Sequence, residues 1–327
     1  MQMGKTLALA GNQSTAIDVL RALAAKGFAV DYVLTVGPEK APLIADYQDV
    51  ESAGRTLGCA SLRAATYEMN DEATRSLLQE APIDLLISVG WQRLFPAWLL
   101  ERIPLGTYGM HGSSQQLPRG RGRSPMNWSI IEDRTVFYTS LFRYDADVDS
   151  GPIVGTQAFD IRPWDTIRSL QHKNALAQLQ LLLEHLPRLL DGTAAFTRQP
   201  DDVEPTYYPK RVPDDGVVDW RDSAARIDRI VRAVARPYPG AFTFQAGRRI
   251  NVNAGGVFDT QLCFAGALPG EIVAAFNDGT FVVQCGEHSY YVTDWEGAGW
   301  TPAVGMILES KTNASWEKLA RMQAATK

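Results

Sequence analysis

The sequence predicts an α/β protein: a mostly parallel, Rossmann-like sheet flanked by helices, followed by a small OB-like β-barrel. Up to about residue 190, short apolar runs rich in β-branched residues alternate with helical periodicity, which is typical of βαβ units. Glycine, prolines and mixed charges interrupt this pattern at 191–213. Beyond them, short strand-like runs separated by turn residues favour a small β-barrel.

The elements of the first part follow from the spacing of apolar residues. Strands are predicted at 6–10, 30–36, 83–89, 107–110, 136–143 and 152–159. Helices are predicted at 14–26, 46–57, 71–79 and 165–190. The last helix is predicted to bury one face that carries Leu176, Leu179, Leu183, Leu186 and Leu190.

The second part is predicted to open with a short helix that Asp222 caps. Its buried stripe consists of Ile227, Ile230, Val231 and Val234. Strands are expected at 241–245, 250–252, 270–275 and 280–284. We therefore divide the chain into a catalytic domain at 1–195, a linker at 196–213 and a β-barrel-like domain at 214–327.

Composition limits the classes of function. A chain of 327 residues that is 45% hydrophobic and 21% charged is typical of globular proteins. Its formal net charge of −5 argues against nucleic acid as the main partner. The three scattered cysteines, Cys59, Cys263 and Cys285, fit neither a disulfide framework nor zinc-ligand spacing. No apolar run approaches the roughly 20 residues that span a bilayer, so we expect a cytoplasmic protein without a membrane partner.

The turn after the first predicted strand lacks the signature of a dinucleotide site. It reads GNQS from Gly11, without the Gly-x-Gly-x-x-Gly that a nicotinamide pyrophosphate needs. We therefore interpret Gly11 as part of a tight βα turn. Neither a nicotinamide cofactor nor a metal is indicated.

Residues with catalytic chemistry concentrate between 106 and 154. Residues 106–128 read GTYGMHGSSQQLPRGRGRSPMNW, and residues 144–154 read YDADVDSGPIV. An imidazole, carboxylates and a glycine- and arginine-rich loop thus fall between short apolar runs, where an open α/β sheet collects its site residues. Of the four histidines, His111 alone lies in such a setting.

These two segments resemble the folate-dependent formyltransferase family, which includes methionyl-tRNA formyltransferase. Its members carry a stretch like His-Gly-Ser-Leu-Leu-Pro, an Arg-Gly loop, and then Asp-x-Gly-x-Asp-Thr-Gly. The run RGRSPMNW at 121–128 is most similar to the branch that formylates nucleotide-linked sugars. The resemblance implies transfer of a formyl group from 10-formyltetrahydrofolate to a primary amine on a nucleotide-activated amino sugar, with a homodimer as a candidate assembly.

The resemblance also implies a catalytic pair, His111 and Asp149. A neutral imidazole with an ordinary pKa of about 6.5 can take and return a proton near neutral pH. A neighbouring carboxylate would orient the ring and favour its protonated form. Asp145 and Asp147 are rivals for that position, although the family pattern places the carboxylate before Ser150. The alternatives are a structural histidine at a strand end and a turn-forming aspartate.

The family's catalytic Asn corresponds to Gly109 in this chain, and a two-residue insertion follows His111. Losing one oxyanion donor can lower the rate about a hundred- to a thousandfold. Our hypothesis is that the inserted segment compensates, with Gln115, Gln116 and Ser113 as candidate donors. A catalytically silent ligand-binding homologue is the alternative that Gly109 motivates.

Candidate binding residues lie on both sides of this motif. Arg121 and Arg123 could bind phosphate, because guanidinium groups match phosphate oxygens; the alternative is a solvated basic loop. The resemblance places the pterin of the cofactor along Ser88, Val89, Gly90 and Trp91, with Asp145 and Asp147 nearby, although Trp91 can equally be a packing residue. Formylation of hydroxyornithine or initiator tRNA, and transfer of another one-carbon or acyl unit, remain alternative activities.

Overall fold

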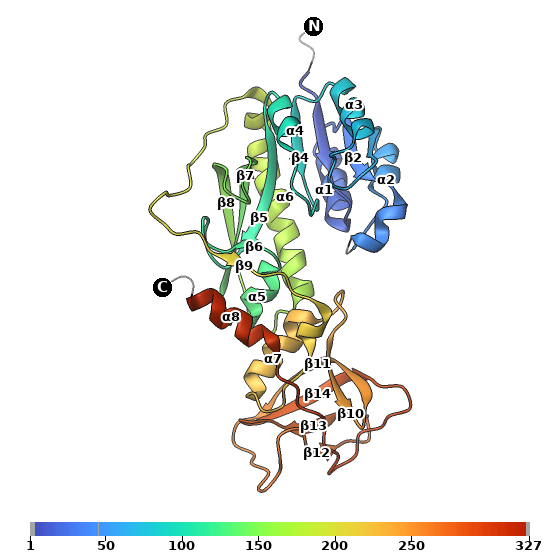
Figure 1. The fold of residues 1–327 in the computed structure, drawn as a ribbon, viewed down its shortest axis with the longest axis vertical. Coiled ribbons are helices and arrows are strands. Elements are labelled where there is room, and N and C mark those ends of the chain that lie inside the picture. The colour runs from blue at the N-terminus through green and yellow to red at the C-terminus, as the bar shows by residue number, and fades with distance from the viewer. Residues whose placement is uncertain (1–3, 45, 325–327) are drawn as a thin grey trace. The chain divides into compact units, whose positions relative to one another are not determined.

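The computed structural model describes residues 4–44 and 46–324, which pack into two compact units (Figure 1). The first unit contains the chain up to Arg121 together with Tyr138–Phe159 and Lys173–Pro205. The second contains Gly122–Phe137, Asp160–His172 and the chain from Thr206 onward. The domain limits at 195 and 214 stay a prediction.

A seven-stranded sheet forms the centre of the first unit, in the order β3-β2-β1-β4-β5-β7-β8. The strands are β1 Leu7–Ala10, β2 Tyr32–Val36, β3 Ala60–Ala64, β4 Leu85–Ser88, β5 Thr107–Ser113, β7 Val136–Arg143 and β8 Ile153–Asp160. β1 to β5 run parallel, and β7 pairs antiparallel with β5. The mostly parallel sheet predicted from the sequence is confirmed.

Helices cover both faces of this sheet, which explains why its strands are continuous apolar runs. In β1, Leu7 and Leu9 belong to one buried cluster, whereas Ala8 and Ala10 belong to the other. The first cluster includes residues of α1, α2 and α6, and the second includes residues of α3 and α4. The bounds are α1 Ser14–Ala25, α2 Val50–Thr56, α3 Glu72–Glu80, α4 Ala97–Arg102 and α6 Ile167–Asp191, with a 3-10 helix η1 at Pro38–Leu43.

The buried face of α6 differs from the predicted one. Leu176 is exposed, and Leu179, Leu183 and Leu190 are only partly buried, so of the predicted set Leu186 alone is fully buried. The face that packs on the sheet carries Ala177, Leu181, Leu182, Leu186 and Leu189. The prediction was wrong because nine leucines on one helix allow more than one apolar stripe at helical spacing.

The second unit is built around a five-stranded antiparallel sheet in the order β10-β11-β14-β13-β12. Its strands are β10 Ala241–Gln245, β11 Arg248–Asp259, β12 Ile272–Ala275, β13 Phe281–Gln284 and β14 Ser289–Glu296. Residues 307–309 pair with β10 through Phe244↔Glu309 and with the start of the β12 region through Glu271↔Ile307. One segment therefore connects both edges of the sheet, as in a partly closed barrel.

Short elements complete the fold. They are β6 Arg121–Gly122, α5 Pro125–Ile131, β9 Tyr207–Tyr208, the 3-10 helix η2 Pro213–Gly216, α7 Ala224–Val234 and α8 Ala314–Ala324. The predicted stripe on α7 is buried, but its N-cap is Ser223, whose hydroxyl accepts a hydrogen bond from the Arg226 backbone N–H. Asp222 does not cap the helix, because its carboxylate instead accepts a hydrogen bond from Trp316 Nε1 at 2.8 Å and pairs with Arg226. Within residues 4–44 and 46–324, no helix combines the length and apolar character needed to cross a membrane.

Candidate active site

His111 lies inside β5, where the strand reaches the carboxyl edge of the parallel sheet. The sequence predicted that the strand would end at 110, but the antiparallel ladder with β7 continues to Ser113, with His111 opposite Ser140. The additional pairing exists because β7 lies beside β5, a neighbour that local sequence does not specify. The His111 side chain is 9% exposed, so its ring is held in a mostly buried position.

Asp149 contacts the His111 ring. The distance from His111 Nδ1 to Asp149 Oδ2 is 3.2 Å, and no Asp145 or Asp147 contact with His111 exists in the described part of the chain. Asp149 has a φ of 53°, a left-handed conformation that aspartate and asparagine tolerate better than most residues. The structure thus brings together the two residues predicted as a catalytic pair.

The second nitrogen of the ring also faces an oxygen. His111 Nε2 lies 2.7 Å from the backbone carbonyl oxygen of Gly120. A neutral imidazole carries one N–H, so it can donate to Asp149 or to Gly120 but not to both, whereas an imidazolium donates to both. A ligand can therefore exchange a proton with Nε2 only if it replaces the contact with Gly120.

Gln199 holds the acidic loop in place. Its side-chain amide Nε2 donates to the backbone oxygens of Asp149 at 2.8 Å and Gly151 at 2.9 Å. Its Oε1 accepts a hydrogen bond from the Arg121 guanidinium at 2.6 Å. Gln199 is 6% exposed and follows Thr197, which pairs with Ile153 at the start of β8. One buried amide thus links the loop that carries Asp149 to the glycine- and arginine-rich loop.

Asp145 and Asp147 shape the same loop from its exposed side. Asp145 Oδ1 accepts hydrogen bonds from the Asp147 backbone N–H and from the Ser150 hydroxyl. Gly151 admits no side chain, because a Cβ there would lie 1.7 Å from the Arg143 backbone oxygen. The role of Asp145 and Asp147 in binding the cofactor stays a prediction.

The other predicted site residues differ in exposure. Ser113 is buried, and its hydroxyl accepts a hydrogen bond from the Gln115 backbone N–H at 3.1 Å. Gln115 is partly buried and Gln116 is exposed. Arg121 is buried with its guanidinium on Gln199, whereas Arg123 is exposed. Their roles as oxyanion donors or phosphate ligands remain predictions.

The predicted pterin segment lies where the strand order reverses, between β1 and β4, and ligands of open α/β sheets bind at such a switch point. Ser88 ends β4, and the Val89 backbone N–H donates to the Ala10 oxygen at 2.8 Å. Gly90 has a φ of 72°. The indole of Trp91 stacks on Phe95, while its Nε1 is buried without a hydrogen-bond partner among the described residues.

Comparisons with known proteins identify the family. The sequence model described as "Formyl transferase" matches residues 5–186, which include His111 and Asp149. The chain belongs to the formyl transferase family. A second model, "Formyl transferase, C-terminal domain", matches residues 211–301 of this formyl transferase, so the family membership predicted from the two motifs is confirmed.

Solved structures share the fold of this formyl transferase. HypX from Aquifex aeolicus, in complex with tetrahydrofolic acid, is 17% identical with a TM-score of 0.63, over 96% of this chain and 47% of its own. The N-formyltransferase from Helicobacter canadensis is 15% identical with a TM-score of 0.62, over 89% of this chain and 100% of its own. A sugar N-formyltransferase from Shewanella is 15% identical with a TM-score of 0.59, over 80% and 99%. The chain therefore spans about half the length of the HypX structures it matches.

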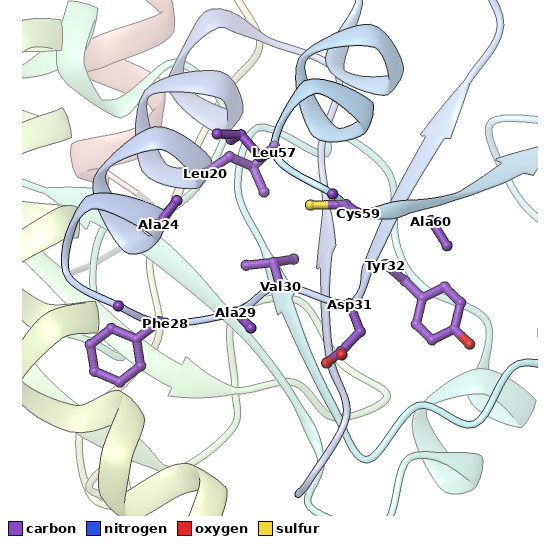
Figure 2. Close-up of a pocket in the computed structure, with 12 residues that line it drawn as sticks. Leu20, Ala24, Phe28, Ala29, Val30, Asp31, Tyr32, Leu57, Cys59 and Ala60 are labelled. Carbon is purple, nitrogen blue, oxygen red and sulfur yellow. The ribbon is translucent and has the colours of Figure 1, made fainter.

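A pocket of about 530 Å³ lies elsewhere in the formyl transferase, at the amino ends of β2 and β3 (Figure 2). Leu20 and Ala24 of α1 and Cys59 are among its mostly apolar lining residues. Its carboxylate, Asp31, accepts a hydrogen bond from the Leu7 backbone N–H at 2.8 Å, and burial raises the pKa of the Cys59 thiol. The Asp31 carboxylate is bonded to the backbone of the sheet and the Cys59 thiol stays protonated. We therefore do not regard this pocket as the catalytic site.

Two residues of the site were not predicted, Gln199 and Tyr144. Gln199 falls in the stretch predicted as a linker, 50 residues from Asp149, and no local pattern distinguishes it there. Tyr144 directly precedes the acidic loop. Its hydroxyl group within the motif is the sequence feature that could have identified it as a site residue. Its side chain lies against Gly109.

Replacing Gln199 by Leu is expected to weaken both the fold and the site of the formyl transferase. The change removes the oxygen that accepts from Arg121 and the amide that donates to two carbonyl groups, which costs about 1–3 kcal/mol of unfolding free energy. A shifted Asp149 loop is expected to lower kcat by up to about 100-fold. Thermal unfolding and tetrahydrofolate release measure the two effects, and Gln180→Leu on the exposed side of α6 is the control. Wild-type kcat in Gln199→Leu would contradict the positioning role.

Proposed function

We propose that this formyl transferase moves the formyl group of 10-formyltetrahydrofolate to a primary amine of a nucleotide-activated amino sugar. The observation that carries the proposal is the His111 Nδ1 to Asp149 Oδ2 distance of 3.2 Å at the carboxyl edge of the sheet. An imidazole held by a carboxylate is the arrangement that moves a proton to and from a reacting nitrogen.

The reaction requires a proton to leave one nitrogen and reach another. The amine nitrogen attacks the formyl carbon, a C–N bond forms, and the carbonyl oxygen becomes an oxyanion. The bond from the formyl carbon to N10 of the folate then breaks, the oxyanion returns to a carbonyl, and N10 takes up a proton. The products are a formamide and tetrahydrofolate.

His111 is the proposed carrier of this proton. Asp149 accepts the Nδ1–H hydrogen bond, which leaves Nε2 as the basic nitrogen of the neutral ring. Nε2 takes the proton from the attacking amine and returns it to N10. Because Nε2 faces the Gly120 carbonyl at 2.7 Å, we expect the incoming amine to replace this contact, with a small rotation of the ring or a shift of residues 114–120.

The residues at the switch point fit a folate ring. The Trp91 ring is buried against Phe95 and Tyr67, at centroid distances of 5.7 and 4.9 Å, and is thus held in a fixed position. Its Nε1–H is a buried donor without an acceptor among the described residues, and such a group suits a polar ligand atom. Bound there, the cofactor would supply the activated formyl group, while the chain's part is to orient it and exclude water.

The choice of acceptor rests on three observations. The run RGRSPMNW at 121–128 resembles the branch that acts on nucleotide sugars. The Helicobacter canadensis structure contains folinic acid and dTDP-3-aminofucose, and this chain matches its entire length. An exposed Arg123 is available for a phosphate group.

The proposal is tested by offering different amines together with 10-formyltetrahydrofolate. We expect tetrahydrofolate release and a mass gain of one formyl group with dTDP-3-aminofucose or another nucleotide amino sugar. Hydroxyornithine and initiator methionyl-tRNA serve as competing acceptors. Turnover with one of these two, and none with any nucleotide amino sugar, would refute the assignment of the acceptor. A missing response to every amine would refute the transferase activity itself.

A further inference from the structure

Gly109 leaves a space that the Tyr144 side chain fills. A Cβ built on Gly109 would lie 2.0 Å from Tyr144 Oη and 2.1 Å from its Cζ. Alternate residues of a strand project from the same face of a sheet, so positions 109 and 111 of β5 share one face. The phenol hydroxyl therefore occupies, on the His111 side of the sheet, the volume that any other residue at 109 would use.

Packing fixes the Tyr144 ring in this position. The Tyr144 backbone N–H donates to the Thr107 oxygen at 2.7 Å, which extends the pairing of β7 with β5. The ring contacts Phe95 and Phe142, with centroid distances of 5.6 and 5.3 Å. A ring held by backbone and aromatic neighbours keeps its hydroxyl in one place, which is the requirement for a preorganised donor.

The Tyr144 hydroxyl is a neutral donor under ordinary conditions. Burial raises the pKa of Tyr144 to about 12; the Ser88 hydroxyl opposes this shift, and the charge of Asp149 adds to it. At neutral pH the group therefore carries its proton. The opposing effect comes from a side-chain hydrogen bond with Ser88; with Ser88 as its donor, the phenol proton stays available to a ligand.

We propose that the Tyr144 hydroxyl donates the hydrogen bond that stabilises the oxyanion formed during formyl transfer. The inference rests on the proposed function, because the oxyanion appears when the amine adds to the formyl carbon and disappears when the bond to N10 breaks. Tyr144 keeps its proton throughout. It strengthens a hydrogen bond as negative charge develops on the oxygen, which lowers the barrier.

The polar groups beside His111 make other contacts. The two nitrogens of His111 face Asp149 and Gly120. The Arg121 guanidinium donates to Gln199, and the Ser113 hydroxyl lies within 2.0 Å of where a Cβ of Gly120 would be and accepts from Gln115. Tyr144 thus differs from these groups in combining a fixed position with a proton available to a ligand.

Replacing Tyr144 by Phe removes the hydroxyl and keeps the ring. We expect kcat for tetrahydrofolate release to fall about 10²- to 10³-fold, with KM and the unfolding temperature close to wild type. Tyr108→Phe is the matched control, because the Tyr108 hydroxyl donates to the Leu105 oxygen and its ring belongs to the cluster on the opposite face. This control is expected to keep wild-type turnover.

A second, independent test moves the hydrogen-bond donor from Tyr144 to position 109. Gly109→Asn alone is expected to be inactive, because its side chain overlaps the Tyr144 ring. Tyr144→Ala opens the space and loses the donor. The double variant Gly109→Asn/Tyr144→Ala is expected to recover at least about tenfold over Tyr144→Ala, since an Asn amide can donate from the same volume.

The outcomes separate this inference from the proposed function. Wild-type kcat in Tyr144→Phe, with a wild-type enzyme that transfers formyl groups, would overturn the donor role and leave the function intact. Hydrolysis of 10-formyltetrahydrofolate to formate, which passes through the same kind of oxyanion without an amine, provides a readout that is independent of the acceptor. If the wild-type chain shows neither transfer nor hydrolysis, the inference falls together with the function.

Discussion

Replacing His111 by Asn is expected to lower kcat for formyl transfer about 10²- to 10⁴-fold. The imidazole is the proton carrier between the amine and the folate nitrogen, and positioned general acid–base groups contribute rate factors of about this size. Asparagine is polar and smaller than histidine, so it fits a side-chain position that is only 9% exposed, and we expect the fold to be retained. Initial rates of tetrahydrofolate release at saturating amine measure the effect.

The control for this prediction is His172→Asn. His172 is exposed on α6 and should leave kcat unchanged. If His111→Asn retained more than about a tenth of the wild-type kcat, a proton-transfer role for His111 would be untenable, and the contacts of the ring with Asp149 and Gly120 would have to be purely structural.

Replacing Asp149 by Asn is expected to lower kcat on the order of 10²- to 10⁴-fold, as for carboxylates that orient a catalytic imidazole. The amide no longer offers a negative charge to Nδ1–H, so the ring loses its preferred tautomer and the stabilisation of its protonated form. Asparagine tolerates the φ of 53° at this position. The Gln199 hydrogen bond to the backbone oxygen of residue 149 also remains. The loss should therefore appear in kcat and not in the unfolding temperature.

Asp147→Asn is the matched change within the same loop. Asp147 is exposed and its backbone N–H, not its carboxylate, contacts Asp145. We expect its kcat to stay within about twofold of wild type, since the predicted role of Asp147 in cofactor binding would change the KM for 10-formyltetrahydrofolate and not kcat. Equal losses in Asp147→Asn and Asp149→Asn would point to the overall charge of the loop and not to a His111–Asp149 pair.

The local pattern predicted most strands of the first unit because their two buried faces leave an uninterrupted apolar run. β7 was predicted with its observed bounds, and β1 and β4 within one or two residues. The local pattern was insufficient where pairing with another segment sets the bounds of a strand. β14 and α8 were not predicted, and β5 extends to Ser113 because β7 supplies hydrogen-bond partners.

In the candidate site, too, some residues could be predicted from local motifs and others depend on tertiary contacts. His111 and Asp149 could be named from two short motifs, since their chemistry is visible in the residue types and their spacing. Gln199 could not, because its value comes from reaching Asp149, Gly151 and Arg121 at once. Neither could the function of Tyr144, because Gly109 and Tyr144 become neighbours only after β5 and β7 pair.

By itself, the sequence determined most strands of the first unit, the family, and the two residues expected to move a proton. These properties depend on apolar periodicity and on residue types that lie close together along the chain. The tertiary structure decided which residue holds the Asp149 loop and which side chain fills the space above Gly109. Both depend on contacts between segments that are distant in sequence. Such contacts form, and stabilise the site, only when the sheet has folded.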